Sequence, residues 1–226
     1  MDKRVGGRGG RTGGVAGEVW LREPRTYRSA PPLTRDRIVE AAIMLLDTDG
    51  PDGLTMRRLA ERLGAGPTTL YWHVRTKDDV LDLALDEIFG EVPVPPGRGD
   101  WRADVRTLIT GWRDVMVHHP WAPALLGRPM LGPNVLTRTE FLQSTLVRGG
   151  FDGIALAAAT HGLANYVIGA ALTQAAATRP AVSADAHVRA HADAYPTLAA
   201  TGHLDNQDWD DLFARALDAF IEGLAP

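Results

Sequence analysis

Five side chains that can donate hydrogen bonds stand close together near residue 70 of this 226-residue chain: Thr68, Thr69, Tyr71, Trp72 and His73. Four cations flank them in the sequence, namely Arg57, Arg58, Arg75 and Lys77. Hydroxyl, indole and imidazole groups can contact base edges and sugars, whereas arginine and lysine contact phosphates. The chemistry that these residue types favour is recognition of double-stranded DNA.

The sequence offers little chemistry of other kinds. It has no cysteine, which excludes disulfides, thiolate metal sites and a cysteine nucleophile. His118 and His119 are the only adjacent histidines, but neighbouring positions on a helix point apart, so a shared metal is not expected. There is no HExxH-like spacing and no glycine-rich phosphate loop after a strand. We therefore expect no catalytic residue, no metal and no cofactor.

Two short helices would position the donors. Thr55 is a predicted N-cap of the first helix, whose apolar face is formed by Leu59, Ala60 and Leu63. Gly64 follows the last of these, where a left-handed turn favours a residue without Cβ. The pattern predicts that the first helix ends at this glycine.

The second helix is expected over Pro67–His73. Pro67 suits a first helical position, where its missing N–H costs nothing. Leu70 would pack this helix onto the first, where small Ala60 permits a close crossing. The spacing predicts a helix-turn-helix.

The run from Leu33 through Asp86 resembles the DNA-binding region of the tetracycline-repressor-type (TetR) family of bacterial transcription regulators. The resemblance is carried by IVEAAIMLLDTDG, GLTMRRLAERLG and TTLYWHVRTKDDVLD. It implies that the helix beginning at Pro67 enters the major groove. In this interpretation Thr68, Thr69 and Tyr71 meet base edges or phosphates, and the DNA backbone is positioned by Arg57, Trp72, His73 and Lys77.

Composition divides the chain into three parts. Residues 1–32 are rich in Gly and Arg, so we expect a disordered arm, which could reach the DNA backbone or a minor groove. Residues 33–92 should form a three-helix DNA-binding domain with a linking helix over 76–91. A proline-rich break, VPVPPGRG, precedes a predicted ligand-binding and dimerisation domain over 99–226. No strand pattern is visible, so the predicted fold class is all-α.

Charge is distributed unevenly along the chain. The first 77 residues contain 14 Lys and Arg against 9 Asp and Glu, whereas the remainder contains 10 against 19. A basic N-terminal third joined to an acidic remainder suits a protein that presents one end to phosphates, although the net charge is −4.

The stretch Phe151–Thr178 is long, apolar and rich in Ala and Gly. A membrane helix is the alternative, but His161, Asn165 and Gln174 within it favour a buried central helix. Residues 1–30 lack the apolar core of a signal peptide, so we expect a cytoplasmic protein without a membrane partner.

Further helices are expected over 100–118, 133–148, 183–195 and from about 207, with at most a short helix in the proline-broken region 119–132. The resemblance implies a homodimer that pairs through 151–178 and 207–224 as a four-helix bundle. Independently, the last helix has apolar residues on more than one stripe, and a monomer would leave some of them in water.

A ligand pocket is expected among these helices. It would be lined by Trp112, Trp121, Leu125, Met130 and Phe141, which suit a flat or hydrophobic molecule. Its polar points would come from Arg128, Gln143, His161 and Asn165, of which the last two are four residues apart and share a helix face. For each of these residues a purely structural role is the alternative.

The C-terminal part resembles the branch that contains the tetracycline repressor itself. By position, Trp112 replaces an aromatic pocket residue and Arg128 matches an arginine of the drug site. The magnesium–drug chelate of that site is held by His and Glu, where this chain has Asn165 and Thr173. A magnesium–tetracycline effector is therefore not expected.

The function predicted from these patterns is that of a transcriptional regulator, most often a repressor, released from operator DNA by a small aromatic or hydrophobic effector. The ligand would favour a conformer in which the 76–91 helix has swung, in proportion to its differential affinity for the two states. Two alternatives stay open: a helical small-molecule-binding protein without significant DNA binding, and a purely structural dimer module. The effector and the operator are not specified by the sequence.

Overall fold

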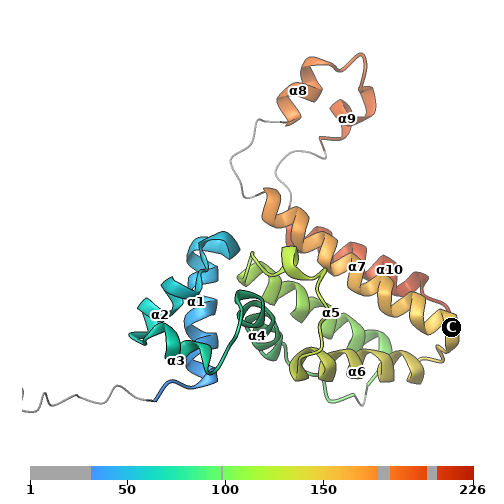
Figure 1. Ribbon diagram of the computed structural model, residues 1–226. Coiled ribbons are helices and arrows are strands. Elements are labelled where there is room, and N and C mark those ends of the chain that lie inside the picture. The colour runs from blue at the N-terminus through green and yellow to red at the C-terminus, as the bar shows by residue number, and fades with distance from the viewer. Residues whose placement is uncertain (1–31, 98, 178–183, 203–207) are drawn as a thin grey trace, which may run out of the picture. The chain divides into compact units, whose positions relative to one another are not determined.

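The computed structural model describes residues 32–97, 99–177, 184–202 and 208–226, and within these ranges the chain is helical and has no strand. This confirms the predicted all-α class. The expected arm lies outside the described residues except for Pro32. The elements, drawn in Figure 1, are α1 (Arg35–Gly53), α2 (Met56–Leu63), α3 (Pro67–Tyr71), α4 (Lys77–Gly90), α5 (Trp101–His118), the 3-10 helix η2 (Pro123–Leu125), α6 (Pro133–Arg148), α7 (Gly153–Ala177), α8 (Ala184–Ala190), α9 (Pro196–Thr201) and α10 (Trp209–Gly223).

Helix α1 is the support for the next three helices. Thr34 caps its start by accepting a hydrogen bond from the Arg37 N–H, and its buried stripe includes Ile38, Ala42 and Leu46. Gly50 has φ 68° and ψ −178°, which interrupts the helical backbone just before Pro51. α1 packs against both α2 and α4, and α2 packs against α3.

Helix α4 joins the first helices to the rest. It begins with a capping box, in which Thr76 accepts from the backbone N–H of Asp79 while the Asp79 carboxylate accepts from the Thr76 N–H. One buried stripe, with Val80, Ala84 and Ile88, runs along it. Because α4 packs against α1, α5 and α6, displacement of this helix would change the packing on both of its sides, against α1 and against α5 and α6.

Helix α5 is the centre of the C-terminal half, where it contacts α6, α7 and α10. α7 buries one residue per turn toward this core, at Ala159, Leu163, Val167 and Ala171. α7 is long and apolar enough to cross a membrane by length and composition. It packs against α5 and α6, but only 22% of its most apolar window is buried within one copy, so the expected buried central helix is buried along one stripe only.

The C-terminal helices differ from the sequence prediction in two places. The helix expected over 183–195 is shorter, ending at Ala190, and a second short helix, α9, was not predicted. α10 buries Phe213, Leu217 and Ile221 and leaves Leu212 and Ala216 exposed, as expected for one copy of a helix whose apolar residues form more than one stripe. A single stripe at i, i+4 and i+8 suffices to pack α10 within one copy of the chain.

Candidate nucleic-acid interface and effector cavity

At the turn between α2 and α3, the capping and turn residues lie where the sequence predicted them. Thr55 accepts a hydrogen bond from the Arg58 N–H at 3.2 Å and starts α2. Gly64 ends it in the left-handed region, with φ 61°, a conformation that is strained for residues with a side chain. Pro67 is the first residue of α3, and Leu70 is fully buried together with Leu59. The two helices therefore form a rigid pair whose packing residues all point inward.

The other side of α3 faces solvent. Pro67, Thr68, Thr69 and His73 are exposed, and Tyr71 and Trp72 are 50% and 84% exposed. Two adjacent exposed aromatic rings form an apolar patch, and such patches can mark an interaction site. α3 itself ends at Tyr71, two residues earlier than expected, and Trp72 serves as its C-cap. The predicted DNA-contacting residues of 67–73 thus share one accessible surface, which we call the α3 surface.

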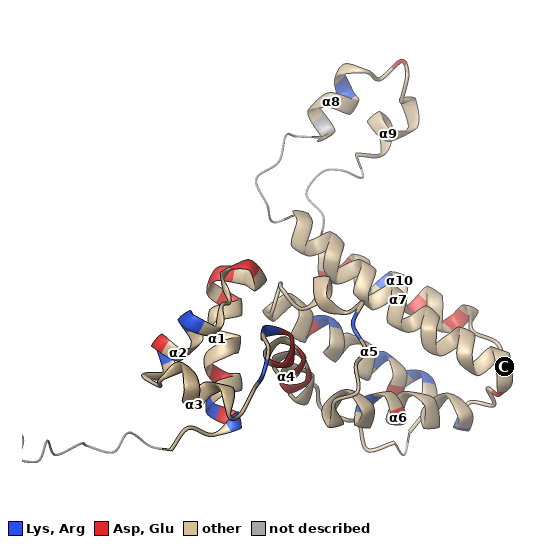
Figure 2. Cartoon of the chain, in the orientation of Figure 1, with Lys and Arg blue, Asp and Glu red and all other residues tan. Residues whose placement is uncertain are grey.

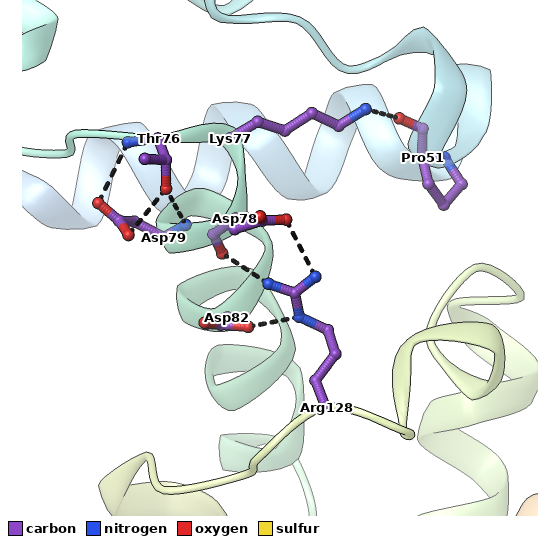
Figure 3. A network of polar contacts seen from close by, with 7 residues as sticks. All are labelled: Pro51, Thr76, Lys77, Asp78, Asp79, Asp82 and Arg128. Atoms are coloured by element: carbon purple, nitrogen blue, oxygen red, sulfur yellow. Dashed lines mark hydrogen bonds and ion pairs between the residues drawn. The ribbon is translucent and has the colours of Figure 1, made fainter.

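The flanking cations have different roles in the fold. Arg57 is exposed and forms an ion pair with Glu61 at 2.8 Å. The hydrogen bond from Arg57 to Glu61 is the larger cause that raises the pKa of the guanidinium, and the negative charge of Glu61 is the smaller one. Arg58 braces α2 against α1, because it donates to the Gly53 carbonyl and to Asp49. Lys77 Nζ donates to the Pro51 carbonyl at 2.6 Å, so in this structure its ammonium group is bound to the end of α1 (Figure 3).

A cavity of about 350 Å³ lies in the C-terminal half. Its lining comes from α4, α5, the segment between η2 and α6, α6 and α7: Phe89, Trp112, Met116, Leu126, Arg128, Met130, Val135, Thr139, His161, Ala164, Asn165, Val167 and Ile168. The volume and the mainly apolar lining with a few polar groups are typical of a small-molecule site. Trp112 meets Phe89 edge to face, with ring centroids 6.2 Å apart.

Trp112 and three of the four predicted polar residues line this cavity, the three being Arg128, His161 and Asn165. Gln143 does not: it is exposed on α6, one turn beyond Thr139, which takes the lining position on that helix. Of the other expected lining residues only Met130 is present, since Trp121 packs at the α1 junction described below, and Leu125 and Phe141 pack against the core.

Arg128 connects the cavity to α4. Its Nε donates to Asp82 at 2.7 Å, and its terminal nitrogens donate to the Asp78 carboxylate at 3.0 Å and the Asp78 carbonyl at 3.4 Å (Figure 3). The Asp82 hydrogen bond is the main cause that raises the pKa of Arg128, with a smaller contribution from Asp78. Acidic residues gather along α4, as Figure 2 shows, so the arginine meets a helix of opposite charge.

The remainder of α4 is attached to α6. Asp86 accepts hydrogen bonds from the backbone N–H of Val135 at 3.0 Å and of Asn134 at 3.4 Å, the first turn of α6. Gly132 must lack a side chain here, because a Cβ would lie 2.1 Å from Asp86 Oδ1. At the far end, buried Arg138 donates to the carbonyls of Gly90 and Val92 at 2.6 Å and to Asn134 at 3.1 Å. Burial lowers the pKa of Arg138, and the charge of Asp86 opposes this.

A second junction joins α1 to the segment after α5. Asp47 accepts from Trp121 Nε1 at 2.7 Å and lies 2.7 Å from Nδ1 of buried His119. The sequence indicated none of this, because Asp47 is 72 positions from His119 and 74 from Trp121.

Several functional candidates were missed by the sequence, and a signal existed for some of them. Met116 lies one turn after Trp112, and Ile168 lies seven residues after His161, so helical spacing from the predicted residues would have found both. Phe89 carries no such signal, because it belongs to a different helix and reaches the cavity only through the packing of α4.

Comparisons with known proteins agree with this arrangement. The model of the family described as bacterial regulatory proteins, tetR family, matches residues 38–84. The model described as tetracyclin repressor-like, C-terminal domain, matches residues 92–226.

Three relatives illustrate the similarity. The chain is 44% identical to an HTH-type transcriptional regulator of Saccharopolyspora erythraea, covering 94% of this chain and 93% of that protein. It is 30% identical to the class D tetracycline repressor protein of Escherichia coli, covering 84% and 88%. Its fold is similar to that of the TetR family protein ActR of Streptomyces coelicolor in complex with (S)-DNPA, with a TM-score of 0.76, 32% identity and coverage of 86% and 98%.

Proposed function

The chain belongs to the TetR family of bacterial regulatory proteins, and from this premise we propose that it is an operator-binding transcriptional repressor released by a small aromatic or hydrophobic effector. The family is one of regulators, and we assign this chain no catalytic residue and no cofactor. Its place of action is the cytoplasm, where the operator is.

The observation that carries the proposal is the division of α3 into two sides. Leu70 is fully buried against α2, whereas Thr69 and Tyr71 on either side of it are exposed. Such a helix is fixed from behind and presents its polar face to a groove. Thr68, Thr69 and Tyr71 are the base-reading candidates, and Arg57, Trp72 and His73 position the DNA backbone.

Two copies of the chain are needed to read a palindrome, with their recognition helices about 34 Å apart. We assign pairing to α7 and α10, where apolar side chains remain in water within one copy. Ile154 is 86% exposed, Leu172 is 42% exposed and Leu212 is 44% exposed. In this proposal residues 33–92 form the DNA-binding domain and 99–226 the ligand-binding and dimerisation domain.

Effector binding reaches the α3 surface through α4. Phe89 and Arg128 both line the cavity, and both connect it to α4. Phe89 belongs to α4, and Arg128 forms ion pairs with Asp78 and Asp82 of that helix. α4 in turn packs against α1, which supports α2 and α3. A ligand that binds more tightly when α4 has shifted therefore separates the two recognition helices and lowers operator affinity.

The test measures binding of the purified protein to labelled DNA from upstream of its own gene, by fluorescence anisotropy at fixed salt. Thr69→Ala and Tyr71→Ala should each weaken binding by about 1–3 kcal/mol if a base contact is lost, with unchanged circular dichroism. The affinity of the unmodified chain should also fall steeply with salt, because phosphate contacts release counterions.

Glu140→Gln, an exposed change on α6 outside the α3 surface and the pairing helices, serves as the matched control and should leave DNA affinity unchanged. Unchanged affinity in both α3 variants would contradict the assignment of the α3 surface. No binding to any upstream DNA, with retained ligand binding, would favour the alternative of a small-molecule-binding protein.

A further inference from the structure

The lining of the cavity has an uneven chemistry. Of the described residues that line it, none is Asp or Glu, and Arg128 is the one that carries a permanent positive charge. An apolar cavity with an arginine and no carboxylate is complementary to an anionic ligand.

A second observation indicates a missing acceptor. Trp112 is 7% exposed, and its Nε1–H has no hydrogen-bond partner among the described residues. An indole N–H can only donate, and a buried donor without a partner is disfavoured. Because Trp112 lines the cavity, we expect that a ligand oxygen bound there can accept from this donor.

The ion pairs of Arg128 can be exchanged for others at low cost. The side chains of Asp78 and Asp82 are 71% and 52% exposed, so water can hydrate these carboxylates when the arginine leaves. Exposed ion pairs contribute little to stability. A carboxylate that enters the drier cavity forms a stronger, charge-assisted and bidentate pair with the same guanidinium.

The two ends of α4 differ in this respect. Arg138, at the C-terminal end, is buried and donates only to backbone carbonyls, which no ligand in the cavity can replace. Arg128, at the N-terminal end, is held by side chains (Figure 3). Loss of the Arg128 ion pairs would therefore separate the end of α4 nearest α3 from the segment between η2 and α6, while the other end stays attached to α6.

We propose that the effectors are flat aromatic molecules that carry a carboxylate, and that Arg128 leaves Asp78 and Asp82 to bind this carboxylate. A ring oxygen of the ligand accepts the hydrogen bond of Trp112 Nε1. Arg128 is thus both the residue that selects an anionic ligand and the positioning residue that transmits binding to α4. The inference deepens the proposed function, on which it rests, by naming the ligand class and the release step.

Three probe compounds separate these contributions: 9,10-anthraquinone-2-carboxylate, its neutral 2-carboxamide, and anthracene-2-carboxylate, which lacks the ring oxygens. Binding to the purified dimer, without DNA, is measured by titration calorimetry. The unmodified chain should bind the anthraquinone acid at least about tenfold more tightly than the amide, as a charge-assisted pair requires. Arg128→Gln should abolish this preference, and Trp112→Phe should abolish the preference for anthraquinone over anthracene.

Arg148→Gln is the matched control, because Arg148 of α6 forms an ion pair with Asp104 of α5 and does not line the cavity. It should retain the preference for the acid. Equal affinity of the unmodified chain for acid and amide, a preference that survives in Arg128→Gln, or binding of none of the three probes would each overturn the proposal.

The transmission of ligand binding from Arg128 to α4 is tested by exchanging the charges of Arg128 and Asp82. Arg128→Gln should lower operator affinity about two- to fivefold without ligand, because it removes two exposed ion pairs to α4, whereas Arg128→Glu combined with Asp82→Arg should restore it. The exchanged protein should no longer be released by the acid, and release that persists in it would overturn the transmission step. Failure of the unmodified chain to bind any operator would contradict the proposed function instead, since the binding titrations contain no DNA.

Discussion

The α3 surface and the cavity are two binding regions built in opposite ways. The residues of the α3 surface are neighbours in sequence, from Pro67 to His73, and most of their side chains are in water. The residues of the cavity extend from Phe89 to Ile168, and they meet only because α4, α5, α6 and α7 pack together. The α3 surface therefore depends on one buried anchor, Leu70, whereas the cavity depends on the packing of all four helices.

The largest effect is expected where the α3 surface is anchored. Leu70→Ala removes a fully buried side chain between α2 and α3 and should lower the free energy of unfolding by about 2–5 kcal/mol. Tyr71→Ala, the adjacent exposed position, should change it by less than about 0.5 kcal/mol and act on DNA affinity alone. Urea denaturation measures both, and equal losses of stability would contradict the division of α3 into an anchoring and a reading side.

The next effect concerns the fixed end of α4. Arg138→Met removes the donors for the Gly90, Val92 and Asn134 carbonyls and should cost about 2–4 kcal/mol, because these buried acceptors lose a charged partner. Arg57→Met is the matched control, since its ion pair on α2 is exposed and should contribute about 0.5 kcal/mol or less. Urea unfolding compares them, and similar small losses would exclude Arg138 as the attachment of α4.

Two buried tryptophans, Trp112 and Trp121, differ in whether the indole N–H has a hydrogen-bond acceptor. Trp121→Phe removes an N–H that donates to Asp47 and should cost about 1.5–3 kcal/mol, as expected for a hydrogen bond to a charged group. Trp112→Phe removes an unpaired N–H, so its lost packing is partly offset and the cost should stay below about 1.5 kcal/mol. Thermal and urea unfolding measure the difference, and a larger loss for Trp112→Phe would show that its N–H is paired in solution.

The smallest effect is expected at the start of α4. Thr76→Ala removes the N-cap and should lower stability by about 1 kcal/mol. Hydrogen bonds to Asp79, first from the Arg75 N–H and then from the Thr76 hydroxyl, lower the pKa of Asp79 below its ordinary value of 3.8. The stability that this carboxylate contributes is therefore present above pH 3.8 and is lost as the pH falls through the folded-state pKa.

Urea midpoints measured from pH 7 down to pH 3 test this effect. Asp79→Asn should make the loss of stability in acid shallower, while Glu87→Gln, an exposed change on the same helix, should leave the curve as it is. An unchanged curve for Asp79→Asn would show that the capping box does not sense pH in solution.

Much of the DNA-binding half could be predicted from the sequence because its signals act over a few residues. Thr55, Gly64 and Pro67 each favour one backbone conformation, and each has the predicted place at a helix end. The role of Leu70 followed from spacing alone. The position of the Lys77 ammonium group did not, because its partner, the Pro51 carbonyl, is 26 residues away on another helix.

The cavity was predictable only in part. His161 and Asn165 share a helix face by their spacing, and both line it. Gln143 has similar chemistry to Asn165 and was predicted on the same grounds, but α6 presents Thr139 to the cavity instead. A single sequence does not specify how far along a helix a neighbouring cavity extends.

By itself, therefore, the sequence determined the all-α class, the helix-turn-helix, the residues of the α3 surface and the family, since each depends on local backbone preferences or on a contiguous motif. Only the tertiary structure decided that Arg128 holds α4 through Asp78 and Asp82, that Phe89 of the same helix reaches the cavity, and that Trp112 keeps a free donor there. Arg128 is 46 and 50 positions from Asp82 and Asp78, and whether groups so far apart in the chain meet is settled by the packing of whole helices.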